Sequence, residues 1–177
     1  WLGSESEKHH RPKNTIFHNC LEAVFNKPAA GFTIEQFPAP SKELIQNLHH
    51  VESLILTMMN SKFGGLAVDQ RKHFYYDAIR YWQGILNLLK LEAIIFITVP
   101  QAPFEYLIYE LAKILKIKTL IFEGTWISDR AYVYNDFRLP IPALAEQKKL
   151  NAGKNFTAND LAPDLKSYYL KQTDPTK

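Results

Sequence analysis

The most regular pattern of apolar and polar positions lies between Ala93 and Trp126. Ile94 to Val99 is a short, continuously apolar run rich in β-branched residues, which is typical of a strand buried on both faces of a parallel sheet. Thr119 to Phe122 is a second run of this kind. Between the two, apolar residues recur at helical spacing, namely Phe104, Leu107, Ile108, Leu111, Ile114 and Leu115. This order predicts a right-handed βαβ unit.

Two long helices are predicted upstream of this unit. Ser41 is a favourable N-cap, and an apolar stripe from Leu44 to Met58 predicts a helix that ends near Asn60. Val68 to Leu89 predicts a second helix, with Asp69 as its cap. Helices before and after short apolar strands favour an α/β fold, and we expect a three-layer Rossmann-like domain with a short, mostly parallel sheet flanked by helices.

The remaining segments give weaker patterns. Phe32 to Phe37 alternates Phe and Ile with polar residues, which predicts a half-exposed strand. Thr15 to Phe25 is compatible with either a short strand or a short helix. Residues 147–177 are rich in Lys, Asn and Asp, and we interpret them as a linker or peripheral segment with a short helix at 162–170. The α/β domain itself is expected over residues 1–146.

Composition narrows the class of protein. With 177 residues and 46% hydrophobic content, the chain suits one well-filled core. Its net charge of +3 is too small an excess to indicate a nucleic-acid partner, and we expect none. The single cysteine, Cys20, excludes an internal disulfide and fits the reducing cytoplasm. No apolar run reaches the roughly 18–20 residues of a membrane span. Because the chain begins with Trp1 rather than Met, we interpret it as a fragment.

Polar residues follow both strands of the βαβ unit, where open α/β sheets bind their ligands. Gln101 follows the first strand and suits a polar contact to a sugar hydroxyl or carbonyl, although the turn that contains it could serve geometry alone. Glu123 ends the second strand, so its carboxylate must face the crevice or find a basic partner, for which Arg130 is the candidate. If the domain takes part in a transfer reaction, Glu123 is the only plausible general base.

Two more residues complete the candidate site. Trp126 offers a flat face to a sugar ring or a base, with an interface or core aromatic as the alternative. Asp129 and Arg130 together could orient an anionic ligand. By contrast, Glu105 and Glu110 are expected on the solvated face of their helix.

Fingerprints of other sites are missing from the sequence. No phosphate-binding or dinucleotide-binding glycine motif is found. Carboxylate, histidine and cysteine spacings give no metal-ligand signature, so we expect neither a metal nor a cofactor. The adjacent His9 and His10 are interpreted as part of a solvated loop in residues 1–13, against a phosphate or metal role.

The motifs around this unit resemble a known family. Val-Pro-Gln-Ala-Pro after the first strand, the following helix, and Phe-Glu-Gly-Thr-Trp-Ile-Ser-Asp-Arg after the second resemble bacterial capsule and surface-polysaccharide biosynthesis proteins. Those proteins look like two-domain glycosyltransferases with paired Rossmann-like domains. The resemblance covers roughly residues 70–138. Members often carry a histidine after the strand proline, where this chain has Gln101, so no histidine-based role is expected here.

The resemblance implies a function for the chain. It would be the amino-terminal, acceptor-side domain of a protein that transfers a sugar from a nucleotide-sugar donor to a glycan acceptor. The nucleotide-sugar site would lie mainly in a missing carboxyl-terminal domain, so this fragment would be incomplete for catalysis, and peripheral membrane association would be compatible with the role. The alternative is a non-catalytic Rossmann-like ligand-binding or regulatory module. A self-contained hydrolase is disfavoured, because no Ser or Cys nucleophile follows a predicted strand.

Overall fold

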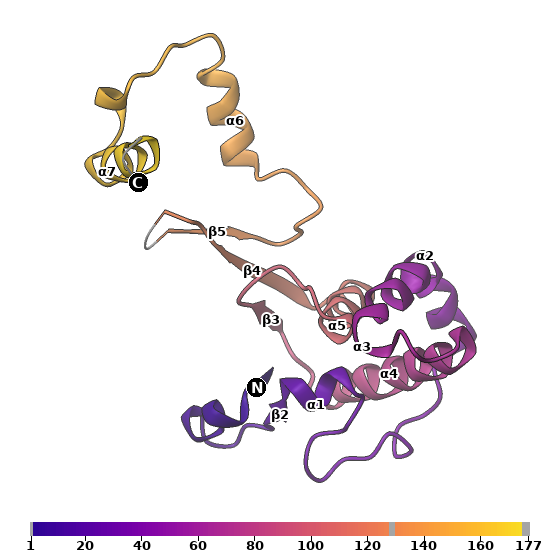
Figure 1. The fold of residues 1–177 in the computed structure, drawn as a ribbon. Coiled ribbons are helices and arrows are strands. Elements are labelled where there is room, and N and C mark those ends of the chain that lie inside the picture. The colour runs from indigo at the N-terminus through magenta and orange to yellow at the C-terminus, as the bar shows by residue number, and fades with distance from the viewer. Residues whose placement is uncertain (1, 128–129, 175–177) are drawn as a thin grey trace. The chain divides into compact units, whose positions relative to one another are not determined.

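The computed structural model describes residues 2–127 and 130–174 of the chain. It is a mixed α/β structure with one two-stranded and one three-stranded sheet (Figure 1). Its strands are β1 Leu2–Gly3, β2 His18–Asn19, β3 Ala93–Phe96, β4 Lys118–Gly124 and β5 Ala131–Tyr134. Its α-helices are α1 Cys20–Val24, α2 Lys42–Met58, α3 Asn60–Phe63, α4 Val68–Leu89, α5 Pro103–Ile114, α6 Pro142–Leu150 and α7 Pro163–Thr173. Two 3-10 helices are η1 Glu5–His10 and η2 Ala158–Asp160.

The chain divides into two compact units. The first unit combines Trp1–Ile94 with Pro100–Thr119, and the second combines Ile95–Val99 with Leu120–Lys177. The first unit therefore holds helices α1 to α5, whereas the second holds most of the three-stranded sheet with α6 and α7. Among the described residues, no helix is long and apolar enough to cross a membrane.

Helices α2 and α4 confirm two predictions from the sequence. α2 begins after Ser41, whose Oγ accepts a hydrogen bond from the backbone N–H of Leu44 at 3.1 Å. α4 covers the predicted residues, but its predicted cap is wrong. The residue before the helix is Ala67, and its N–H donates to the side chain of Gln70 at 3.0 Å. Gln70 thereby replaces Asp69 in stabilising the helix start.

Helix α5 is buried on more sides than its pattern predicted. Pro103 occupies its first turn, as expected, and the Glu105 carboxylate accepts hydrogen bonds from the N–H groups of Gln101 and Ala102, each at 3.0 Å. Every residue from 106 to 112 is buried, including Glu110, which is only 3% exposed. The prediction that Glu110 is solvated is wrong, because α1, α2 and α4 all pack against α5.

The three-stranded sheet has the order β3-β4-β5. β4 and β5 run antiparallel, with Phe122 opposite Val133 and Glu123 opposite Tyr132. The first predicted strand ends earlier than expected and is not buried on both faces, since Ile95 is 63% exposed and Ile97 is 87% exposed. A β-branched apolar run suits an extended chain whether or not other elements cover it, so that prediction of burial is wrong.

The strand predicted at Phe32 to Phe37 is also wrong. This segment contains turns and bends. Its backbone pairs with no strand among the described residues and is bound by the side chain of Arg80 in α4. Arg80 donates from Nε to the carbonyl of Phe37 at 2.6 Å and from a terminal nitrogen to the carbonyl of Glu35 at 2.8 Å. Phe37 itself is buried and lies edge-on to Tyr81, with ring centroids 5.9 Å apart. The alternation therefore reflects a loop that buries Phe37 while Thr33, Glu35 and Gln36 stay exposed.

Two ambiguous segments take definite forms. Thr15 to Phe25 contains both candidate structures, because β2 leads directly into α1. Asn19 joins them, since its side-chain oxygen accepts hydrogen bonds from the N–H groups of Leu21 and Glu22. Near the C-terminus, α7 confirms the short helix expected at 162–170.

Candidate functional site

The strongest candidate from the sequence, Glu123, contacts the segment that follows β3. Its Oε2 accepts hydrogen bonds from the backbone N–H of Val99 at 3.0 Å and from Oγ1 of Thr98 at 3.1 Å. Both contacts are partly buried, so they are shielded from competing water. One carboxylate oxygen therefore holds the chain after β3 beside the end of β4.

Arg130 has a different partner from the one expected. Its guanidinium lies 2.5 Å from Oδ2 of Asp164 in α7, and about half of each side chain is exposed. This hydrogen bond, followed by the charge of Arg130, lowers the pKa of the Asp164 carboxyl. The interaction links the turn after β4 to α7, whereas the predicted role of Arg130 was to neutralise Glu123.

The register of β4 and β5 places tyrosines beside Glu123. Successive side chains of a strand point to opposite faces, so Glu123 shares one face with Tyr132, directly opposite it, and with Tyr134. The pKa of Tyr134 is raised, first by burial and then by the negative charge of Glu123. Tyr134 therefore stays a neutral phenol at physiological pH, able to donate a hydrogen bond on this face.

Trp126 occupies the turn between β4 and β5 and is 94% exposed. The turn is closed by the N–H of Thr125, which donates to the carbonyl of Arg130 at 2.9 Å. Within it, Oγ1 of Thr125 accepts from the N–H of Ile127 at 3.2 Å and donates to the Ile127 carbonyl at 2.8 Å. The alternative of a core aromatic is thus wrong within this chain. The indole of Trp126 is therefore available to solvent from a position next to Thr125, whose side chain is fixed by its hydrogen bonds to Ile127.

Two other predicted residues remain, Gln101 and Asp129. Asp129 is outside the described residues. Gln101 is an exposed residue just before α5, in the first unit, where its N–H donates to Glu105. The structure thus gathers Glu123, Trp126 and Arg130 on β4 and the turn that follows it.

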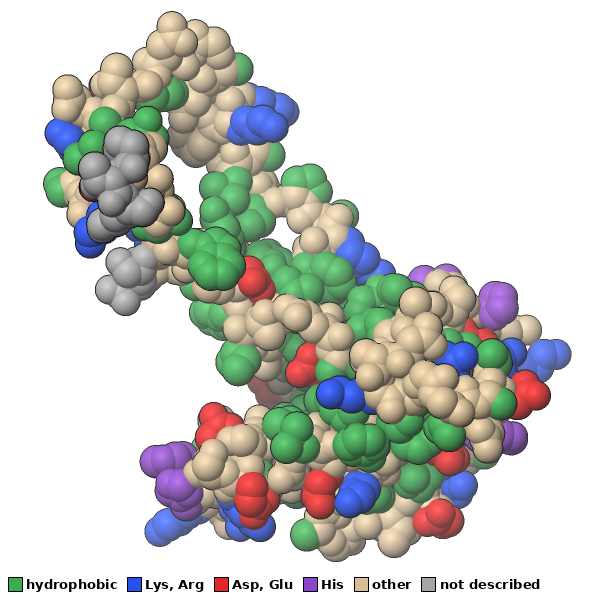
Figure 2. Space-filling model, in the orientation of Figure 1, with side chains coloured by type: hydrophobic (Ala, Val, Ile, Leu, Met, Phe, Trp, Pro, Cys, Tyr) green, Lys and Arg blue, Asp and Glu red, His purple; other side chains and the backbone are tan. Residues whose placement is uncertain are grey.

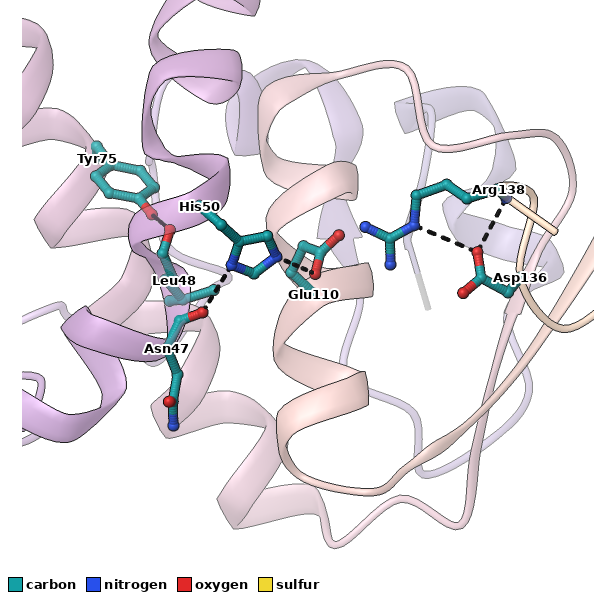
Figure 3. Close-up of polar contacts among 7 residues, drawn as sticks. All are labelled: Asn47, Leu48, His50, Tyr75, Glu110, Asp136 and Arg138. Carbon is teal, nitrogen blue, oxygen red and sulfur yellow. Dashed lines mark hydrogen bonds and ion pairs between the residues drawn. The ribbon is translucent and has the colours of Figure 1, made fainter.

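A histidine–carboxylate pair between α2 and α5 was missed by the sequence predictions. The imidazole of His50 lies between the carbonyl of Asn47, 2.9 Å from Nδ1, and the carboxylate of Glu110, 3.6 Å from Nε2 (Figure 3). Protonation of the ring makes the second contact an ion pair that joins the two helices. Apolar residues all around α5 were the signal that could have indicated burial of Glu110.

Figure 3 also draws two contacts that have local roles. The hydroxyl of Tyr75 donates to the carbonyl of Leu48 at 3.4 Å, and burial raises the pKa of this phenol. In the second unit, Oδ1 of Asp136 accepts from the backbone N–H of Arg138 at 2.9 Å and lies 3.4 Å from its Nε. The first contact supports α2 against α4, and the second shapes the loop after β5.

A second histidine, His18, is buried in an aromatic cluster. Its ring stacks on Trp82 at a centroid distance of 4.9 Å and meets the edge of Tyr81 at 5.6 Å. His18 is 5% exposed, and its Nε2 has no hydrogen-bond partner among the described residues. Burial is the main cause that lowers its pKa. The imidazole therefore acts as a neutral packing group.

Metal-binding geometry is not found in the part of the chain that the structure describes, where no three His, Cys, Asp or Glu side chains converge. Comparisons with protein-family models, with curated proteins and with solved structures found no match to this chain.

Proposed function

We propose that the turn between β4 and β5 is a glycan-contacting element of a glycosyltransferase-like protein of surface-polysaccharide biosynthesis. In this proposal the chain supplies the amino-terminal, acceptor-side domain. A domain outside this sequence supplies most of the nucleotide-sugar site. Support comes from the sequence resemblance over residues 70–138 and from the exposure of Trp126.

The exposed indole is the observation that carries the proposal. Sugar rings have an apolar C–H face, and an uncovered aromatic ring can stack against it while neighbouring polar groups bind the hydroxyls. Arg130 and Asp164 are such groups, because both lie partly exposed and form an ion pair with each other. An exposed pair of this kind contributes little to stability, so either member can exchange its partner for a sugar hydroxyl.

The fold supports the same proposal in a general way. β3 and β4 are neighbours in the sheet and are joined through α5, as the strands of a Rossmann-like βαβ unit would be. We propose that this unit belongs to a three-layer Rossmann-like arrangement. Gln101 remains a predicted contributor to acceptor binding, as does Asp129.

For Glu123 we propose a positioning role in preference to general-base catalysis. Its Oε2 is already bound to Thr98 and Val99, so it holds the segment after β3 in place. This engagement also favours the second candidate function, a non-catalytic ligand-binding module. Turnover of a labelled nucleotide sugar by a longer protein that contains this chain separates the two candidates, because only the transferase consumes the donor.

Glycan binding by the chain itself is tested by titration with hexose- and N-acetylhexosamine-containing oligosaccharides, followed by tryptophan fluorescence. The titration uses a Trp1→Phe background, in which Trp126 should dominate the response because Trp82 is buried. Trp126→Ala should weaken binding at least about tenfold, the effect of losing roughly 1.4 kcal/mol. Phe156→Ala, at another exposed aromatic of the second unit, is the matched control and should bind as the parent does. Equal affinity of all three proteins would refute the proposal.

A further inference from the structure

The N-terminal segment forms a closed loop. β1 and β2 pair in parallel, with Leu2 opposite His18 and Gly3 opposite Asn19. Residues 4–17 therefore form a loop that connects two paired strands. η1 lies inside this loop, and Asn19 Nδ2 donates to Oε2 of Glu5 at 3.2 Å. The segment expected to be a solvated loop is thus fixed at its base.

Both ends of the loop have ordered turns. At the start of η1, the N–H of Ser4 donates to Oε2 of Glu7 at 2.7 Å. On the returning side, Oγ1 of Thr15 donates to the carbonyl of Pro12 at 2.5 Å, and Asn14 takes a left-handed conformation with φ of 63°. Asparagine tolerates this conformation better than most residues, so the 12–15 turn is locally favoured.

These two turns border a pocket of about 790 Å³ that is wide open to solvent. Lys8, His9, Arg11 and Lys13 line it, with Glu5 and the 12–15 turn completing the wall. In Figure 2, histidine, basic and acidic side chains gather over this segment, which Figure 1 draws in indigo.

The charges of the pocket are not balanced. Glu5 forms an ion pair with Lys8, whose Nζ lies 2.8 Å from Oε1 of Glu5. This hydrogen bond is the main cause that lowers the pKa of the Glu5 carboxyl. Arg11 and Lys13 also line the pocket, and neither has an ion pair within the described residues. Two cationic side chains thus face the pocket without a carboxylate partner, which favours an anionic ligand.

We propose that this pocket binds a small diphosphate-bearing anion, such as a nucleoside diphosphate. The guanidinium of Arg11 can bind two phosphoryl oxygens at once, and the ammonium of Lys13, two residues along, can neutralise the adjacent phosphoryl group. His9 lines the same pocket, and its ring lies against that of His10 with centroids 4.0 Å apart, so it can contribute an N–H donor or a ring face. The proposal does not depend on glycan binding at Trp126.

A small ligand fits the observations better than a nucleic acid does. The cations that line the pocket, Lys8, Arg11 and Lys13, all lie within six residues of one another, and the chain as a whole has a net charge of only +3. Recognition of a nucleic-acid backbone requires a row of contacts along successive phosphates. A pocket with two unpaired cations matches two linked phosphoryl groups.

The test is a calorimetric titration of the whole chain with inorganic pyrophosphate and with UDP. We expect saturable binding of both, and amide NMR shifts confined to residues 5–15. The variant Arg11→Gln/Lys13→Gln should bind about ten- to a hundredfold more weakly, as expected for lost charge-assisted hydrogen bonds. Lys148→Gln/Lys149→Gln in α6 is the matched control, with the same loss of charge elsewhere, and should bind normally.

Several results would overturn the proposal. They are the absence of saturable binding at millimolar ligand, an equal loss in both double variants, or amide shifts outside residues 5–15. Binding to phosphatidylglycerol vesicles without binding of pyrophosphate or UDP would also overturn it, since the ligand would then be a lipid surface. Circular dichroism of each variant establishes that it is folded before its affinity is interpreted.

Discussion

Removing the Glu123 carboxylate should release the segment that follows β3. In the folded chain, Oε2 of this residue accepts from the N–H of Val99 and from the hydroxyl of Thr98. Glu123→Ala removes this shared acceptor and leaves a partly buried N–H without its partner. We expect the variant to fold, with lower stability of the unit that contains β4 and with a mobile segment after Phe96.

The size of the effect follows from these two hydrogen bonds. A buried hydrogen bond to a charged group contributes about 1.5–3 kcal/mol. Both contacts here are only partly buried, so we expect about 2 kcal/mol in total for Glu123→Ala. In a chain of 177 residues this corresponds to a fall in melting temperature of about 4–8 °C. Glu123→Gln keeps an acceptor oxygen and should lose about half as much free energy.

The assay combines thermal unfolding with hydrogen exchange at the Val99 amide. Thr98→Val should cost about 1 kcal/mol, and combining it with Glu123→Ala should cost less than the sum of the single losses, because they share one contact. Glu146→Ala, at an exposed carboxylate in α6, is the control and should leave both readouts unchanged. If Glu123→Ala has the parent melting temperature and the parent exchange rate at Val99, Glu123 does not hold this segment.

Two further predictions concern the helical unit. Because burial lowers the pKa of His18, the folded state keeps this imidazole neutral, so the free energy of unfolding should be highest above the ordinary pKa of 6.5 and should fall as the pH drops towards the lower folded-state pKa. Urea unfolding across this range should show that slope in the parent and less of it in His18→Phe, and an identical slope would assign the pH dependence to other groups. Gly84→Ala would place a Cβ atom 2.2 Å from Cγ of Phe37 and should cost about 1–3 kcal/mol in the same assay. Gly65→Ala meets nothing within 4 Å and is its control, so equal urea midpoints for the two variants would contradict the packing of Phe37 on α4.

Local signals in the sequence predicted the helices well. Ser41 caps α2 by accepting a hydrogen bond from the N–H of Leu44, three residues along the chain. The apolar stripe of α2 forms the buried face of the helix. Such features depend on residues a few positions apart, so spacing alone reveals them. α4 shows the limit of the approach, because Gln70 took the role expected of Asp69 within the same turn.

Burial and pairing could not be predicted in the same way. Glu110 is buried because three helices pack against α5, whereas Ile95 is 63% exposed although its type suits a buried strand. The partners of Glu123 lie 24 and 25 residues upstream, and the partner of Arg130 lies 34 residues downstream. Spacing along the chain carries no information about such contacts. The sequence therefore suggests Glu123 as the partner of Arg130, whereas the structure gives Asp164.

Oligosaccharide titration of the parent and of Trp126→Ala is the most direct test of a glycan contact at the turn between β4 and β5. We expect a saturable change in tryptophan emission in the parent, and an affinity at least about tenfold lower by calorimetry in Trp126→Ala. Phe156→Ala should match the parent in both measurements. Undiminished calorimetric binding in Trp126→Ala, or no binding by the parent, would contradict the proposed role of this turn.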